Sequence, residues 1–100
     1  MQISQKKEAE KLTLIIEGRV DTTTAPALEE AINKIDADTK DLVLDMSAVE
    51  YISSAGLRVL LAAQKMMSKV GTLKLTGVCE AVMEVFEMTG FSDILTIERM

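Results

Sequence analysis

The sequence predicts an α/β fold: a single domain over residues 1–100, in which helices flank a mostly parallel, mixed sheet of four to five strands. The length of 100 residues, with 48% apolar and 27% charged side chains, is typical of one compact domain. Segments with the apolar period of a strand alternate with segments that have the period of a helix. Gly18, Gly71 and Gly90 follow such segments, and Pro26 suits the first turn of a helix.

Four segments have the alternating or continuous apolar pattern of strands. Residues 12–17 alternate at first and become continuously apolar, and residues 41–46 are apolar enough to be buried on both faces. Residues 72–77 and 94–97 complete the set, and residues 1–8 are a weaker candidate for a partner strand.

Three segments repeat apolar residues at helical spacing. One helix is expected to start after the capping side chains of residues 21–24 and to run to about Ile35. A second starts at Ser54 and stops before Gly71, and a third covers residues 78–88. The side chains expected to face the sheet are Leu28, Ala31, Ile32, Ile35, Leu57, Leu60, Leu61, Met67, Val82, Val85 and Phe86.

This order of strands and helices implies right-handed crossovers between parallel strands. In such sheets functional loops gather where strands end and helices begin. The two loops in that position are expected at residues 19–24 and 47–53.

Composition excludes several classes of function. The net charge of −5 and the lack of a basic cluster argue against binding to nucleic acid or anionic lipid. Without His, and with Cys79 as the one cysteine, the chain lacks the residues of Ser/His/Asp triads, Cys/His nucleophiles and the usual zinc sites. The glycines are too scattered for a phosphate-binding loop, and Glu29 and Glu30 have the setting of a solvated helix face. We therefore expect no enzymatic activity, no metal and no cofactor.

The apolar stretches are short and residues 1–10 are polar, so no membrane insertion and no signal segment are expected. The unpaired Cys79 agrees with a reducing compartment, where it is expected to be a small core or loop residue. These features favour a cytoplasmic protein.

The most informative segment is residues 49–61, where two serines open a helix and two small residues follow. Ser53 or Ser54 can cap the helix, because a serine oxygen accepts a hydrogen bond from the free amides of the first turn. Spacing alone favours this structural role over a functional one. Ala55 and Gly56 suggest the alternative, in which the hydroxyls stay unshielded and the backbone of another protein approaches closely.

Here the sequence resembles the STAS domain proteins that act as bacterial anti-sigma-factor antagonists. The letters YISSAGL at residues 51–57 are similar to the family signature, in which an aromatic and an aliphatic residue precede Asp-Ser-Ser/Thr-Gly-Leu. GRVD at 18–21 with the following Ala25 and Pro26, LVLDMS at 42–47 and VFEMTGF at 85–91 resemble three further family segments in order and spacing. The resemblance spans the whole chain.

The resemblance assigns roles to single residues. It places the family's phosphorylated serine at Ser54, with Ser53 in the position of the preceding Asp and Ala55 in that of the second hydroxyl. Arg58 replaces a residue that is often glycine, and it could pair with phosphate or with a partner's carboxylate. Asp21 matches an acidic residue of the neighbouring loop, where it either caps a helix or contacts the partner. The implied partner-binding residues are Asp21, Thr22, Ser53, Ser54, Ala55, Gly56 and Arg58.

The function that the resemblance implies is a partner switch. The unphosphorylated protein binds an anti-sigma-factor serine kinase and thereby releases a sigma factor, phosphorylation of Ser54 ends the complex, and a serine phosphatase resets the cycle. The alternative is a STAS subunit of a lipid ABC transport complex, which docks on its ATPase without a phosphate cycle.

Overall fold

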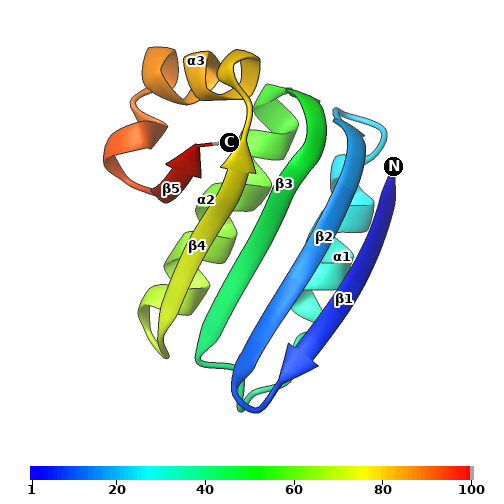
Figure 1. Ribbon diagram of the computed structural model, residues 1–100, viewed down its shortest axis with the longest axis vertical. Coiled ribbons are helices and arrows are strands. Elements are labelled where there is room, and N and C mark those ends of the chain that lie inside the picture. Colours follow the sequence, from blue (N-terminus) through cyan, green and yellow to red (C-terminus); the bar gives the residue numbers. More distant parts are fainter. Residues whose placement is uncertain (100) are drawn as a thin grey trace.

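The computed structural model describes residues 1–99, and these residues form a five-stranded sheet in the order β1-β2-β3-β4-β5 (Figure 1). β1 pairs antiparallel with β2, and every other pair of neighbours is parallel. This confirms the mixed, mostly parallel sheet, and the weak N-terminal candidate is its antiparallel edge strand. The strands are β1 (Gln2–Glu8), β2 (Lys11–Val20), β3 (Asp41–Ile52), β4 (Thr72–Val78) and β5 (Thr96–Arg99).

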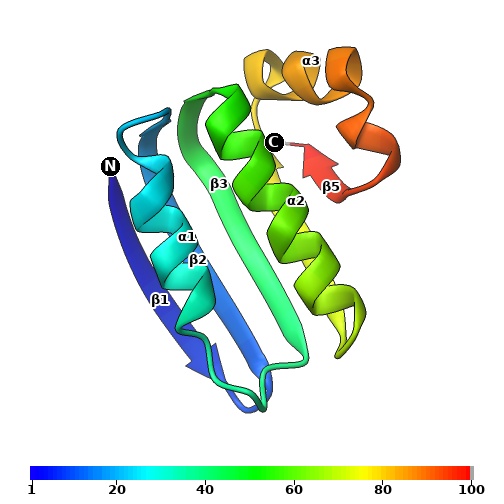
Figure 2. The same ribbon diagram turned by 180° about the vertical axis from the view of Figure 1, so that it is seen from behind.

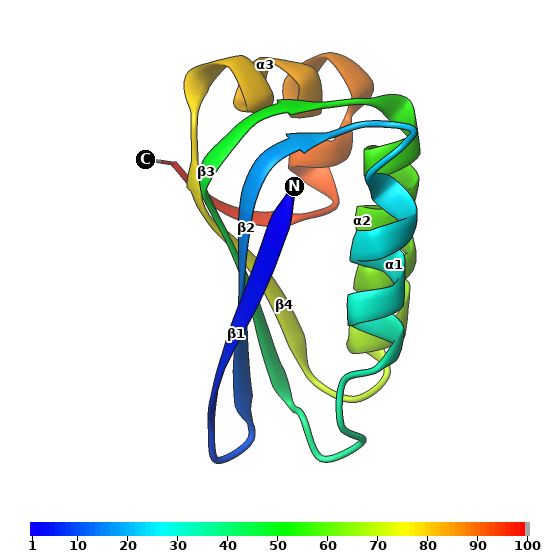
Figure 3. The same ribbon diagram turned by 90° about the vertical axis from the view of Figure 1, so that its right-hand side faces the viewer.

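Three helices accompany the sheet. Figures 2 and 3 show α1 (Ala25–Asn33) and α2 (Ser54–Ser68) on one face of the sheet, with α3 (Glu80–Thr89) across one end. A short 3-10 helix, Phe91–Asp93, leads from α3 into β5. Because the crossovers through α1 and α2 return over the same face, these two helices form a single layer (Figure 3).

The core lies between the helices and the inward face of the strands. Alternate residues of β2 (Leu12, Leu14 and Ile16) are buried, while Thr13 and Ile15 are only half-buried. On β3 the same alternation leaves Val43 and Asp45 half-buried, so the expectation that residues 41–46 are covered on both faces is wrong. The most completely buried large side chains are Phe86, Leu14, Ile16, Leu28, Leu42, Leu44, Met46, Leu60, Met67 and Leu75. Of the side chains expected to face the sheet, Ala31, Ile35, Leu61 and Val85 are half-buried and the others are buried.

The expected loop at residues 47–53 is instead the second half of β3. The register between β2 and β3 shifts twice, after Ile15 and after Gly18, and pairing continues to Val20 and Ile52. Gly18, which has a φ of +105°, lies inside β2 and does not end it. Bulges of this kind bend strands, and Figure 3 shows β2 and β3 curving over the ends of α1 and α2. The bend interrupts the alternation of buried and exposed residues along β3, which explains why its second half was expected to be a loop.

The remaining boundaries differ by small amounts. α1 ends at Asn33, short of Ile35, and β5 occupies Thr96–Arg99 where residues 94–97 were expected. Gly90 ends α3 in the left-handed conformation, as predicted. Gly71 follows α2 for a different reason: a Cβ atom there would lie 1.8 Å from the carbonyl oxygen of Lys40.

Gly56 allows the first turn of α2 to lie directly on the bent strands. A Cβ atom at this buried position would lie 2.7 Å from Cγ1 of Val20 and 2.7 Å from Cγ1 of Ile52. The expectation that Gly56 opens a surface for a partner's backbone is therefore wrong, because the close approach is made inside the molecule.

We predict that Gly56→Ala destabilises the fold by about 1–3 kcal/mol, the usual cost of forcing extra carbon into a packed core. Its matched control is Ala62→Gly on the exposed side of α2, which should also destabilise, by about 1 kcal/mol, through helix propensity alone. Urea unfolding measures both. Since Gly→Ala normally stabilises a helix, a Gly56→Ala variant more stable than the wild type would contradict the packing described here.

Candidate functional site

Ser53 alone connects β3 to α2, and three hydrogen bonds hold it. Its N–H donates to the carbonyl oxygen of Val20 at 2.8 Å, and its own carbonyl accepts from the N–H of Leu57 at 2.9 Å. Its Oγ accepts from the N–H of Gly56 at 3.4 Å, so Ser53 is the residue that caps α2. The structure thus selects Ser53 from the two candidate caps.

Ser54 is the first residue of α2 and is exposed. Within residues 1–99 its hydroxyl makes no hydrogen bond, and the backbone N–H groups of Ser54 and Ala55 have no acceptor. Free N–H groups at a helix start, together with the helix dipole, favour a negative charge. Ser54 therefore presents an accessible hydroxyl beside donors that suit a phosphate.

Asp21 organises the loop at residues 21–24, which is shorter than the expected 19–24 because β2 continues to Val20. Its Oδ1 accepts from the N–H groups of Thr23 and Thr24, at 3.0 and 3.1 Å, and from the Thr23 hydroxyl at 2.7 Å. The Thr23 hydroxyl and these N–H groups hold the pKa of Asp21 below its usual range. Thr24 is the N-cap residue of α1, but its own side chain makes no capping hydrogen bond. The Asp21 carboxylate instead accepts the N–H of Thr24 at the start of this helix. A structural role for Asp21 is therefore present in the fold.

An Arg19–Tyr51 contact lies on the bent part of the sheet and was not expected from the sequence. The guanidinium carbon of Arg19 is 4.2 Å from the centre of the Tyr51 ring, and its Nε is 3.8 Å from Oδ2 of Asp21. Tyr51 is 40% exposed, and the Arg19 guanidinium covers part of its ring. Its outward direction could have been predicted only if β3 had been extended to Ile52.

A shallow hollow of about 290 Å³ separates the starts of α1 and α2 and reaches Ala55, the residue after Ser54. Its lining includes one charged residue from each helix, Glu29 of α1 and Arg58 of α2. Of the predicted site residues, Thr22, Ala55 and Arg58 line this hollow, whereas Asp21, Ser53, Ser54 and Gly56 do not. The full lining is Thr22, Ala25, Pro26, Glu29, Ala55, Arg58 and Val59, of which the sequence did not indicate Ala25, Pro26, Glu29 and Val59 as site residues.

Within the described residues no three His, Cys, Asp or Glu side chains gather closely enough to hold a metal ion. No helix in this part of the chain combines the length and the apolar character needed to cross a membrane.

Comparison with known proteins identifies the family. The STAS domain model matches residues 2–100. BtrV of Bordetella bronchiseptica, which is named as an anti-sigma factor antagonist, is 36% identical over 97% of this chain and 85% of its own length. The anti-sigma-B factor antagonist of Bacillus subtilis is 31% identical over 95% of this chain and 88% of its own.

Solved structures agree with the sequence relatives. An anti-sigma factor antagonist from Mycobacterium paratuberculosis superposes with a TM-score of 0.89 at 28% identity, and the match covers 99% of this chain and 86% of that protein. The fold, the two adjoining helix starts and these relatives lead to one conclusion: the chain belongs to the STAS domain family, among the anti-sigma factor antagonists.

Proposed function

We propose that this protein is a phosphorylation-controlled partner switch of the cytoplasm. When Ser54 is unmodified, the protein binds an anti-sigma-factor serine kinase and so releases a sigma factor. The kinase phosphorylates Ser54 and the complex separates, and a serine phosphatase restores the binding form. The observation that carries this proposal is the division between the two serines: Ser53 is tied into the fold, while Ser54 is exposed with a free hydroxyl.

The fold accommodates the charge that this cycle requires. A phosphoryl group adds about −1.5 to −2 charges at neutral pH. At the start of α2 it meets the free N–H groups of Ser54 and Ala55, and Arg58 lies one helical turn further on the same helix. Phosphorylation therefore changes the surface that a partner meets while leaving the fold intact.

The proposed binding face is the end of the molecule at which α1 and α2 start. Thr22, Ala55 and Arg58 contribute to the lining of the hollow, and Ser54 directly precedes Ala55 in α2. Asp21, Ser53 and Gly56 support this face from within the fold: the Asp21 carboxylate orders the 21–24 loop, Ser53 joins the end of β2 to α2, and Gly56 lets α2 lie on the strands.

A STAS subunit of a lipid transport complex is the less supported alternative, because relatives that match nearly the whole chain are named anti-sigma factor antagonists. Affinity purification followed by mass spectrometry separates the two functions. Recovery of a kinase together with modified Ser54 supports the switch, and recovery of a transport ATPase with unmodified Ser54 supports the alternative.

The first prediction concerns the acceptor. Incubation with the cognate kinase and ATP should modify Ser54 and leave Ser53 unmodified, because the Ser53 oxygen is engaged in the cap. Ser54→Ala should abolish incorporation and give a constitutive binder, whereas Ser53→Ala should retain incorporation and lose about 1 kcal/mol of stability. A phosphopeptide mapped to Ser53 or Ser47 would overturn the assignment.

The second prediction concerns stability. Ser54→Asp places a carboxylate at a helix start, which favours negative charge by about 0.3–1 kcal/mol. Its melting temperature should stay within a few degrees of the wild type while kinase affinity falls. Calorimetry measures both quantities, and gross unfolding of the variant would show that Ser54 has a structural role after all.

The third prediction places the contact surface. Arg58→Glu should weaken kinase binding by roughly 1–3 kcal/mol, because Arg58 lines the hollow beside the acceptor. Lys65→Glu makes the same charge change at an exposed position near the other end of α2 and serves as the control. Equal affinities of the two variants in titration calorimetry would move the binding face elsewhere.

A further inference from the structure

The outer edge of β1 is long and regular, and its charged residues are confined to one end, Lys6 to Glu8. Six of its seven residues are exposed, and its register with β2 runs from Gln2 to Glu8 without a shift. β1 also lacks proline. Proteins usually block such an edge with a bulge, a proline, free charges or a short strand, because the unpaired backbone groups recruit another strand.

The opposite edge of the sheet has the protection that β1 lacks. β5 has only four residues, and its register with β4 shifts between Leu75 and Val78. Charge does not distinguish the two edges, because both carry paired charges. On β1, Lys7 Nζ lies 3.0 Å from Asp36 and 2.7 Å from Asp38, and Lys6 lies 3.6 Å from Glu8. On β5, Glu98 lies 2.6 Å from Lys74 and Arg99 lies 3.5 Å from Glu87. The two edges therefore differ in length and regularity, and so in their readiness to accept another strand.

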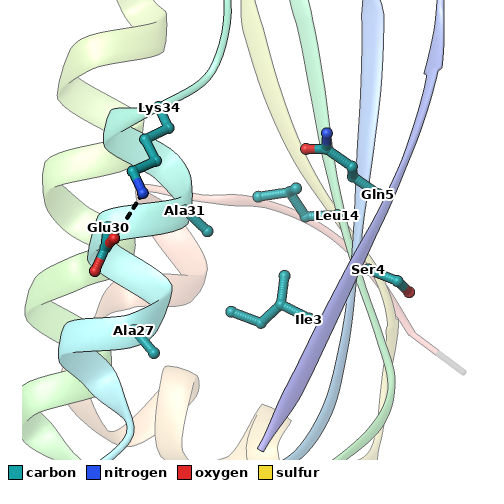
Figure 4. Close-up of a pocket in the computed structure, with 8 residues that line it drawn as sticks. All are labelled: Ile3, Ser4, Gln5, Leu14, Ala27, Glu30, Ala31 and Lys34. Carbon is teal, nitrogen blue, oxygen red and sulfur yellow. Dashed lines mark hydrogen bonds and ion pairs between the residues drawn. The ribbon is translucent and has the colours of Figure 1, made fainter.

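A groove of about 490 Å³ runs along the same edge, between β1 and α1. Figure 4 shows Ile3, Gln5 and Leu14 of the sheet pointing toward Ala27 and Ala31 of α1, while Ser4 points away. The short alanine side chains leave this flank of α1 open. At its rim Lys34 Nζ lies 2.7 Å from Glu30 Oε1.

The sequence of β1 is complementary to itself in one antiparallel register. β1 and β2 are joined by a two-residue turn, so Glu8 and Lys11 form the first hydrogen-bonded pair of the hairpin. Hydrogen-bonded pairs alternate with non-bonded ones along the two strands. Ile3, Gln5 and Lys7 therefore point their backbone N–H and C=O groups away from β2, toward the open edge. A twofold axis at Gln5 would pair these outward groups with those of a second copy. Gln5 then faces Gln5, Ile3 faces Lys7, Ser4 faces Lys6 and Gln2 faces Glu8, so that no like charges are opposed.

The charges on α1 fit the same axis. In Figure 4 Gln5 lies between the levels of Ala31 and Lys34 of α1. Two α1 helices related by a twofold axis at this level run antiparallel, which brings Glu30 of one copy to the level of Lys34 of the other. The edge strand and the adjoining helix thus favour one register.

We propose that two copies of this chain associate through β1. The two β1 strands pair antiparallel and join the two sheets into one continuous sheet, with both α1 helices on the same face. The two grooves merge under the paired α1 helices and are closed from solvent. The Ser54 surfaces lie away from this edge, because α2 is separated from it by α1 (Figure 2). The dimer therefore leaves the surface around Ser54 accessible on both copies. This proposal does not depend on the function proposed above.

Light scattering during size-exclusion chromatography tests the association, with a mass near twice 10.9 kDa expected at high concentration. In a Cys79→Ser background, Gln5→Cys should form an intermolecular disulfide, since bonded antiparallel partners have Cα atoms about 5.5 Å apart. Lys7→Cys is the matched control and should remain reduced, because its symmetry mate lies four residues away along the paired strand. A monomeric mass at all concentrations up to about 1 mM overturns the proposal.

Charge reversal tests the register. Glu30→Lys should raise the dimer dissociation constant about tenfold at low salt, since it opposes like charges twice in each dimer. Adding Lys34→Glu should restore the dimer, and Glu84→Lys on exposed α3, with the same change of net charge, should leave it unchanged. A dimer that is insensitive to Glu30→Lys and does not cross-link through Gln5→Cys uses another surface and contradicts the proposal.

Discussion

The parallel pairing of β2 with β3 is the constraint on which the candidate site depends. Pairing continues through two register shifts until Val20 and Ile52 lie side by side at the same end of the sheet. There the Val20 carbonyl accepts the Ser53 N–H at 2.8 Å, which joins the ends of two strands that are more than 30 residues apart in the chain. α1 and α2 both start at this end of the sheet, only a few residues after β2 and β3 end. The strand pairing therefore places their first turns next to each other.

The order of strands and helices could be predicted because one face of each element is apolar with a regular period. The bent half of β3 could not, since Ser47 and Ala48 interrupt the alternation and the segment reads as polar. Its strand character comes from pairing with β2, a tertiary interaction that no local pattern records. Tyr51 was consequently placed in a loop, and its contact with Arg19 was missed.

The candidate site was predicted in its position and only partly in its roles. Spacing allowed either serine to cap α2, and the choice of Ser53 depends on the hydrogen bond that its N–H donates to the carbonyl of the distant Val20. The buried position of Gly56 depends likewise on Val20 and Ile52. The place of Glu29 in the lining of the hollow could not be predicted, because it depends on the packing of α1 beside α2, which the sequence pattern of α1 does not show.

The one-residue connection between β3 and α2 has a consequence for the energetics of partner exchange. Ordering a flexible loop on binding costs about 1–2 kcal/mol of backbone entropy for each residue fixed. Ser53 is already fixed by hydrogen bonds through both its N–H and its carbonyl group, so a partner that docks beside it meets a preorganised surface. In the proposed switch, the affinity of this partner then depends on the chemistry of the exposed groups rather than on induced ordering, which would allow one added phosphate to decide between the bound and the free state.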